Sequence, residues 1–345
     1  MSRSRRSRNS RSNASYIVIA LMVVILILVG VIGFLIGKER ANNQNSEVVE
    51  STESLKQVDV PETQIVEPEA TSETFAIFGV DSRSNQLGEG TRSDSIMIVQ
   101  VDHVAKNVKV ASVYRDCMVR MEGRKYQKIT HAHQFGGPEY AVEVINDNFD
   151  LEIEHYITVN FNSVSSLVDK IGGIEYTITN EEAGHMGEGF DGAGTYLLDG
   201  DDVVTYSRIR KAAGGDYKRS ERQREMLFKI FEKAKTLDTE TSLEVVDDMM
   251  DSINTNFKQD EIIMMLYQLS KYQMGETTAF PQVFYGGYVE GAWVEVPCTL
   301  IDMNAGLHEF LYGEIEYVPS PEVEEYSAVI RSKVSGPDHD FREDN

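Results

Sequence analysis

The sequence predicts an α/β domain with α+β character, in which a mostly β central sheet is flanked by helices and preceded by one transmembrane helix. Short apolar runs rich in β-branched residues are typical of buried strands, and three follow one another at residues 75–80, 95–101 and 108–114. Helix and strand patterns alternate after them, which favours a sheet covered by helices. A chain of 345 residues with 41% hydrophobic and 26% charged residues suits such a domain.

Residues 16–36 form a continuous apolar and uncharged run. A helix of this length, at about 1.5 Å per residue, spans roughly the 30 Å core of a bilayer. Five arginines and no acid precede the run, whereas Lys38, Glu39 and Arg40 follow it. This bias predicts a basic cytoplasmic tail at 1–15, a signal anchor in the cell membrane and an extracellular remainder. A cleaved signal peptide fits less well, because the run is longer than a typical signal core and no small-residue cleavage motif closes it.

Composition divides the extracellular part. Residues 37–72 are rich in polar residues and proline, which predicts a linker. We expect a catalytic core at 73–236, a carboxy-terminal extension packed on it at 237–333, and a disordered tail at 334–345.

The elements after the first three strands follow from local patterns. Pro138 is expected to open a helix, and Gly172-Gly173 to stop the helix predicted at 163–171. Strands are predicted on either side of that second helix, at 155–161 and 174–178. In the extension, the predicted elements are helices near 243–253 and 260–272 and a short strand and helix ending near 312.

The net charge of −23 argues against a general nucleic-acid binder, and the short cytoplasmic tail cannot hold a DNA-binding domain. Only Cys117 and Cys298 are present, so a cysteine-rich metal site is excluded. One disulfide between them can persist outside the membrane, and the sequence leaves open whether it forms.

Positive charge gathers in "YSRIRKAAGGDYKRSERQREML", residues 206–227, where seven cations meet three acids. On a helical wheel, one apolar face is formed by Met226, Leu227, Ile230, Phe231 and Ala234. Arg219 and Gln223 extend this face, whereas Glu221 and Arg224 point elsewhere. A buried cation is costly unless paired, so Arg219 should meet an internal carboxylate or a bound anion.

The residues before this helix favour the bound anion. If "SRIR" is extended, Arg208 and Arg210 share one side of the chain, and the glycine turn lets the helix present its amino terminus nearby. The alternative is internal pairing, with Asp216 as the helix cap. Three converging guanidinium groups suit phosphate oxygens better, because these accept paired hydrogen bonds.

Carboxylates are expected at the strand ends. Asp81, Arg92 and Asp94 lie near the ends of the first two strands, and Arg115 and Asp116 follow the third. Such carboxylates can simply cap loops, but beside phosphate-binding arginines they would repel an anion unless a hard cation bridges them. We therefore predict a Mg²⁺ and pyrophosphate site.

Five motifs carry a resemblance to a known family. They are "GVDSR…TRSDSIMIVQVD", "ASVYRDCMV", "KITHAHQFGGPEYAVE", "LVDKIGGIEYTI" and the cationic stretch at 206–227. Over about residues 75–236 the chain resembles the LytR-CpsA-Psr family of Gram-positive cell-envelope proteins. The resemblance implies a phosphotransferase that moves an anionic glycopolymer, such as teichoic acid or capsular polysaccharide, from a polyprenyl-pyrophosphate carrier to a hydroxyl of peptidoglycan.

The resemblance also assigns roles to residues. Asp81 and Asp94 would be the carboxylates associated with Mg²⁺. The pyrophosphate-binding set would be Arg92, Arg115, Arg208, Arg210, Asp216, Arg219 and Gln223. "CMVR" at 117–120 departs from the commoner pattern, so Arg120 carries less weight as a ligand, and Lys218 stands where glycine is frequent.

The expected reaction is attack by the acceptor hydroxyl on the glycan-linked phosphorus, with polyprenyl phosphate leaving. Asp81, Asp94 and Asp116 are the candidate bases, and the sequence does not choose among them. Two other functions remain open at this stage: a lipid pyrophosphate hydrolase with water as acceptor, and a non-catalytic envelope receptor or regulator.

Overall fold

The computed structural model describes residues 71–82, 86–210, 215–237, 241, 245, 248–258, 272–289, 291–297, 299–313, 316–333 and 339–340. The predicted cytoplasmic tail (1–15) and the signal anchor (16–36) lie outside these residues. So do most of the linker and most of the helix predicted at 260–272. Within the described part, no helix combines the length and the apolar character needed to cross a membrane.

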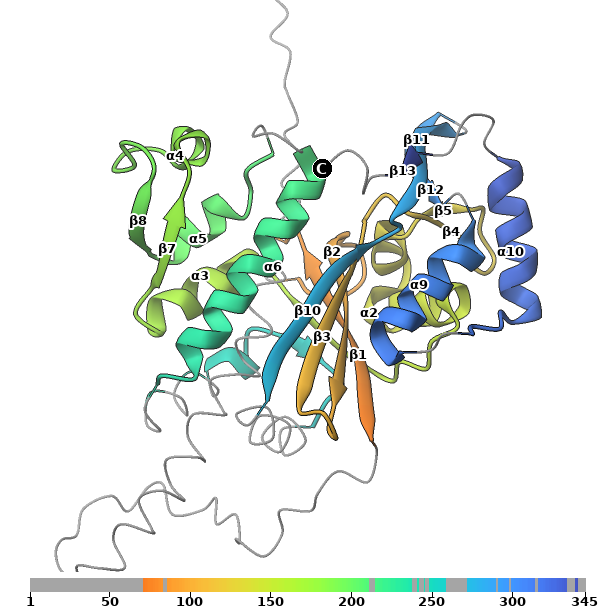
Figure 1. Cartoon of the computed structure of the whole chain (residues 1–345), viewed down its shortest axis with the longest axis horizontal. Coiled ribbons are helices and arrows are strands. Elements are labelled where there is room, and N and C mark those ends of the chain that lie inside the picture. The colour runs from red at the N-terminus through yellow and green to blue at the C-terminus, as the bar shows by residue number, and fades with distance from the viewer. Residues whose placement is uncertain are drawn as a thin grey trace, which may run out of the picture.

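A mixed six-stranded sheet runs through the centre of the described residues (Figure 1). In spatial order its strands are β10 (Gln273–Phe280), β3 (Asn107–Val113), β2 (Ser93–Asp102), β1 (Ser72–Val80), β6 (His155–Val159) and β9 (Asn254–Thr255). The β1–β2 and β2–β3 pairs are antiparallel, whereas β1–β6 and β3–β10 are parallel. The predicted mixed α/β architecture and its first three strands are confirmed.

Helices cover both faces of this sheet (Figure 1). α3 (Phe161–Lys170) and α6 (Gly215–Ala234) lie on one side. α2 (Thr130–Phe149), α9 (Leu300–Tyr312) and α10 (Pro321–Ser332) lie on the other. Because side chains alternate along a strand, Phe75 and Ile77 of β1 enter the core beneath α6, whereas Ala76 and Phe78 enter the core beneath α2.

Two predicted helix boundaries are confirmed. α2 consists of two helical parts joined across a kink at non-helical Gly136 and Gly137, and the second part opens at Pro138 as predicted. Proline suits this first position because its missing N–H would have no helical acceptor there. The end of α3 is confirmed: Gly172 and Gly173 have φ of 81° and 78°, a conformation that glycine adopts without strain.

A hairpin and two short helices follow α3. β7 (Ile174–Ile178), confirmed at its predicted position, pairs with β8 (Gly194–Leu198), and α4 (Asn180–Met186) lies in the connection between them. α5 (Gly200–Tyr206) then leads toward α6. This hairpin lies beside α6, on the side away from the sheet (Figure 1).

The carboxy-terminal part adds strands beyond the short one predicted before the helix that ends near 312. β10 joins the central sheet beside β3. A smaller sheet, in the order β12 (Ala292–Pro297), β11 (Val283–Val289) and β13 (His339–Asp340), lies near the short pair β4 (Met118–Val119) and β5 (Gln127–Lys128). The helix predicted to end near 312 is α9. Cys117 is buried and free, and Cys298 lies outside the described residues.

Candidate functional site

The first part of the site is the rim where β1 ends and β2 begins. Asp81 follows β1, and Arg92 precedes β2. The register between these strands shifts at Gly79 and Val80, so that Asp94 becomes the extra residue of a β-bulge. A bulge re-aims the side chains around it, and Asp94 is buried here with 5% of its surface exposed.

Asp94 forms an ion pair with Arg115, which follows β3. The Asp94 Oδ1 to Arg115 Nη1 distance is 2.6 Å, and only 3% of the Asp94 side chain is exposed. Burial raises the pKa of Asp94, although the charges of Arg115, Arg219 and Arg210 oppose this effect. Three arginines from three different segments therefore act on one carboxylate.

Helix α6 presents its polar positions to this carboxylate. The predicted apolar face is confirmed, since Met226, Leu227 and Ile230 are fully buried. Arg219 and Gln223 extend that face with 4% and 2% of their surfaces exposed. Gln223 Oε1 accepts a hydrogen bond of 3.3 Å from Ser95 Oγ, which joins the helix to β2 beside Asp94.

A pocket lies between this helix and the strand ends. Its lining comes from β2, β3, the segment after β3, α6 and β12: Asp94, Ser95, Ile96, Ser112, Val113, Tyr114, Arg115, Asp116, Arg219, Ser220, Gln223 and Glu295. Of the predicted site residues, five line it. Asp81, Arg92, Arg208 and Arg210 lie outside this lining, and the side chain of Asp216 is not among the described residues.

The segment that carries Arg208 and Arg210 is not extended. The Arg208 N–H donates to Thr205 O at 3.0 Å, and the Ile209 N–H donates to Tyr206 O at 3.1 Å. The end of α5 thus continues into a turn, because these amide groups still find acceptors one turn back. The two arginines nevertheless lie close enough for Arg210, together with partial burial, to lower the pKa of Arg208.

Arg92 and Asp116 occupy the edge of the site. Arg92 is exposed, and its Nε donates to Gln134 Oε1 at 3.0 Å. Asp116 lines the pocket, and its Oδ1 lies 2.7 Å from Lys128 Nζ. The Oδ2 of Asp116 lies 3.8 Å from Arg115 Nε, so this carboxylate bridges a lysine and a site arginine.

Arg224, which the helical wheel places away from the apolar face, takes part in the polar contacts around the site. Its Nη1 donates to Ser112 Oγ at 3.1 Å and to Ser220 Oγ at 3.0 Å, and both serines line the pocket. Burial lowers the pKa of Arg224. The wheel placed Arg224 off the apolar face, but its long side chain reaches Ser112 of β3.

Glu295 is a lining residue that no sequence motif indicated. It comes from β12, and only 6% of its surface is exposed. The Glu295 N–H donates to Asp116 O at 2.8 Å, and this contact brings the strand to the rim. Its backbone partner lies far away in the sequence, so local patterns carried no signal for it.

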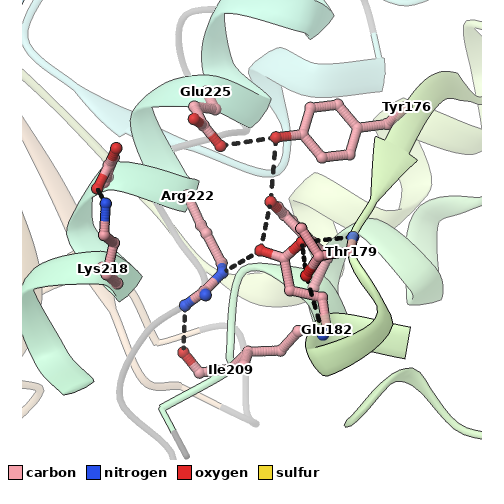
Figure 2. Close-up of polar contacts among 9 residues, drawn as sticks. Tyr176, Thr179, Glu182, Ile209, Lys218, Arg222 and Glu225 are labelled. Carbon is pink, nitrogen blue, oxygen red and sulfur yellow. Dashed lines mark hydrogen bonds and ion pairs between the residues drawn. The ribbon is translucent and has the colours of Figure 1, made fainter. Parts of the chain in front are cut away.

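A second polar cluster lies on the other side of α6, between that helix and the β7–β8 hairpin (Figure 2). Arg222 Nε lies 2.8 Å from Glu182 Oε1, and Arg222 Nη1 donates to Ile209 O at 3.2 Å. The single hydroxyl proton of Tyr206 is shared between Glu182 Oε1 at 3.1 Å and the Tyr176 hydroxyl oxygen at 3.0 Å. Hydrogen bonds from Thr179 and Arg222 outweigh the burial of Glu182 and lower its pKa.

The carboxylates at the rim fit one mode of metal binding. Among the described residues, no cluster of three or more His, Cys, Asp or Glu side chains could hold a metal ion by itself. Mg²⁺ often uses only one or two carboxylates and takes its other ligands from phosphates and water. Asp81 and Asp94, at the adjoining ends of β1 and β2, offer this kind of donor set.

Comparisons with known proteins add to this geometry. A family model described as the LytR_cpsA_psr family matches residues 35–297. The chain is 28% identical over 240 residues to "Polyisoprenyl-teichoic acid--peptidoglycan teichoic acid transferase TagT" of Bacillus subtilis (strain 168), which covers 67% of this chain and 72% of that protein. It is 30% identical over 251 residues to TagU of the same description from Bacillus cereus (strain AH820), covering 69% and 80%.

A solved structure shares the fold. It is described as "LytR-CPS2A-psr family protein YwtF (TagT) with bound octaprenyl pyrophosphate lipid". The TM-score is 0.55 at 21% identity, and the match covers 77% of this chain and 99% of that one.

Proposed function

The chain belongs to the LytR_cpsA_psr family, and on this premise we propose that it transfers an anionic glycopolymer from a polyprenyl-pyrophosphate carrier to peptidoglycan. The names of the TagT and TagU relatives support the reaction, and the octaprenyl pyrophosphate bound to the YwtF protein supports the carrier. The polymer is of the teichoic acid or capsular polysaccharide type, since both types present the same diphosphate to an enzyme.

One observation of this molecule carries the proposal. Arg115, Arg210 and Arg219 come from three segments and act together on the single carboxylate of Asp94 beside a pocket. A diphosphate supplies the negative charge that such a group of guanidinium groups binds, through paired hydrogen bonds to its oxygens.

The reaction follows from this placement. The acceptor hydroxyl oxygen attacks the glycan-linked phosphorus, a new P–O bond forms, and the bond to the bridging oxygen of the carrier breaks. Polyprenyl phosphate leaves with that oxygen, and a rim carboxylate takes the hydroxyl proton. The arginines stabilise the charge that builds on the phosphoryl oxygens in the transition state.

Asp81, Asp94 and Asp116 are the candidate bases. Asp94 already pairs with Arg115, and Asp116 already pairs with Lys128, so a cation lies beside each of these two carboxylates. Separate replacement of each aspartate by asparagine assigns the base, because loss of the base flattens the acid side of the pH–rate profile.

Mg²⁺ is the proposed cofactor, held by Asp81 and Asp94 together with the phosphates of the substrate. When bound, it would neutralise part of the diphosphate charge. Chelation with EDTA should stop transfer, and added Mg²⁺ should restore it; full activity in EDTA would exclude this cofactor.

We also propose that residues 16–36 anchor the chain in the cell membrane by a single pass, with the amino terminus in the cytoplasm and the catalytic part outside. The arginine-rich tail before the apolar run supports this orientation. Protease added to intact cells should digest the catalytic part and spare the tail. The opposite pattern would reverse the proposed topology.

Product analysis tests the function itself. The full chain, reconstituted with lipid-linked glycopolymer and peptidoglycan, should yield polymer bound to peptidoglycan through a phosphodiester. Release of free glycan phosphate would indicate a hydrolase, and lipid binding without turnover would indicate a receptor; either result would contradict the proposed transfer.

A further inference from the structure

Arg222 connects the two segments that carry the site arginines. Its Nη1 donates to the carbonyl oxygen of Ile209 at 3.2 Å, and Ile209 lies between Arg208 and Arg210 in the chain. Arg222 itself lies one helical turn after Arg219 and directly before Gln223 on α6. The hydrogen bond therefore joins the backbone between Arg208 and Arg210 to the helical turn that carries Arg219 and Gln223 (Figure 2).

Glu182, the partner of Arg222, is itself held by several hydrogen bonds. Glu182 Oε1 accepts from Arg222 Nε, while Glu182 Oε2 accepts from the N–H and the hydroxyl of Thr179, both at 2.9 Å, in a capping box that starts α4. The same Glu182 Oε1 accepts from the hydroxyl of Tyr206, the last residue of α5. One carboxylate thus ties α6, the start of α4 and the residue just before the arginine segment together.

Arg222 is suited to holding these segments together and not to contact with substrate. Only 7% of its surface is exposed, and its charge faces Glu182. Its planar fork reaches a carboxylate and a carbonyl in two fixed directions, which the single ammonium group of lysine cannot reproduce.

We infer that Arg222 is a positioning residue, which holds Arg208 and Arg210 at a set distance from Arg219 and Gln223 so that the four side chains meet one diphosphate. This inference rests on the proposed function. Loss of this positioning should have a large effect, because a displacement of about 1 Å in a bound group costs on the order of 100-fold in rate.

The test is the affinity of the full chain, in detergent, for octaprenyl pyrophosphate, with the unfolding midpoint measured on the same samples. The Arg222→Lys variant keeps a positive charge opposite Glu182 and loses the fork. We expect its dissociation constant to rise on the order of 100-fold at a nearly unchanged unfolding midpoint. The matched control is Tyr176→Phe, which removes two hydrogen bonds from the same cluster without touching Ile209, and should bind like the wild type.

A second variant covers the case in which Arg222→Lys does not fold. The double variant Glu182→Leu with Arg222→Met replaces the buried pair by apolar side chains, an exchange that proteins often tolerate. It should show the same loss of affinity. Unchanged affinity in either folded variant would overturn the inference.

A coupling measurement separates positioning from a general structural role. If Arg222 acts through Arg208 and Arg210, then Arg222→Lys should cause no further loss in a chain that already carries Arg208→Ala and Arg210→Ala. A full, additive loss in that background would overturn the inference. Failure of the wild type to bind octaprenyl pyrophosphate would overturn the proposed function, and this inference with it.

Discussion

Two buried carboxylates on opposite sides of α6 face arginines, yet their pKa values move in opposite directions. Burial raises the pKa of Asp94, even with Arg115, Arg219 and Arg210 around it. The pKa of Glu182 is lowered, because hydrogen bonds from Thr179 and Arg222 outweigh its burial. Three arginines act on the carboxylate of Asp94 in the first cluster, whereas a single arginine pairs with Glu182 in the second.

The difference separates two uses of a buried arginine. Arg222 is neutralised by a partner within the fold, and its hydrogen bonds order the chain around it. Arg219, one turn earlier on the same helix, lines a pocket together with Arg115, and both act on the carboxylate of Asp94. A matched ion pair indicates architecture, whereas several arginines that act on one carboxylate beside a pocket favour a site for an anion.

The largest expected effect comes from the arginine in the pocket. Replacing Arg219 by alanine should lower the rate of glycopolymer transfer by about 10³-fold, because a transition-state contact is lost. The rate is measured with the reconstituted full chain. Lys229→Ala, an exposed charge on the same helix, is the control and should retain full activity. Equal losses in both variants would show that the effect does not come from the place of Arg219 in the pocket.

The matched cluster should show its effect in stability. Glu182→Gln leaves the charge of Arg222 buried without its partner, so the free energy of unfolding at neutral pH should fall by about 3 kcal/mol. Because the folded-state pKa of Glu182 lies below its usual value of 4.5, its ionised form stabilises the fold above that pH and ceases to do so as the pH falls through the folded value.

Urea unfolding at neutral and acidic pH measures this dependence. The difference in the free energy of unfolding between wild type and Glu182→Gln should become smaller at the acidic pH. A difference that stays constant with pH would show that the ionised carboxylate is not the source of the stability.

A third change sharpens the electrostatic part of the comparison. Arg115 is the strongest of the charges that hold down the pKa of Asp94, so Arg115→Ala should raise that pKa further. If transfer needs ionised Asp94, activity is lost as the pH falls through this value, and the acid limb of the pH–rate profile should move to higher pH. A lower transfer rate with the acid limb of the pH–rate profile at its wild-type pH would refute the role of ionised Asp94.

The smallest effect is expected at the outer edge of the matched cluster. Tyr176 donates to Glu225 at 2.7 Å and accepts from Tyr206. Removing its hydroxyl in Tyr176→Phe should cost about 1 kcal/mol of stability and leave the transfer rate unchanged. A marked loss of transfer would extend the functional cluster to this hairpin.

The sequence was most informative where a pattern is local. The period of α6 identified its buried stripe and placed Arg219 and Gln223 on it, because side chains three and four residues apart share a helix face. Strand composition located β1, β2 and β3, and with them the rim that carries Asp94 and Arg115. The resemblance to the family drew on the same residues.

What the sequence could not reveal depends on distant partners. Arg222 was left without a role, because Glu182 and Ile209 reach it from other elements. Glu295 enters the pocket on β12, where it forms a bridge with Cys117, which lies far away in the chain. The extended form expected for "SRIR" is wrong for a similar reason: hydrogen bonds back to α5 decide its shape, and the pattern of the four residues does not report them.

The most direct test of the account is a crystal structure of the chain with octaprenyl pyrophosphate. The account predicts that the diphosphate lies in the pocket between α6 and the strand ends, with its oxygens in contact with Arg115, Arg210 and Arg219, while Arg222 still pairs with Glu182. A diphosphate bound elsewhere on the molecule, with these three guanidinium groups out of contact with it, would contradict the account.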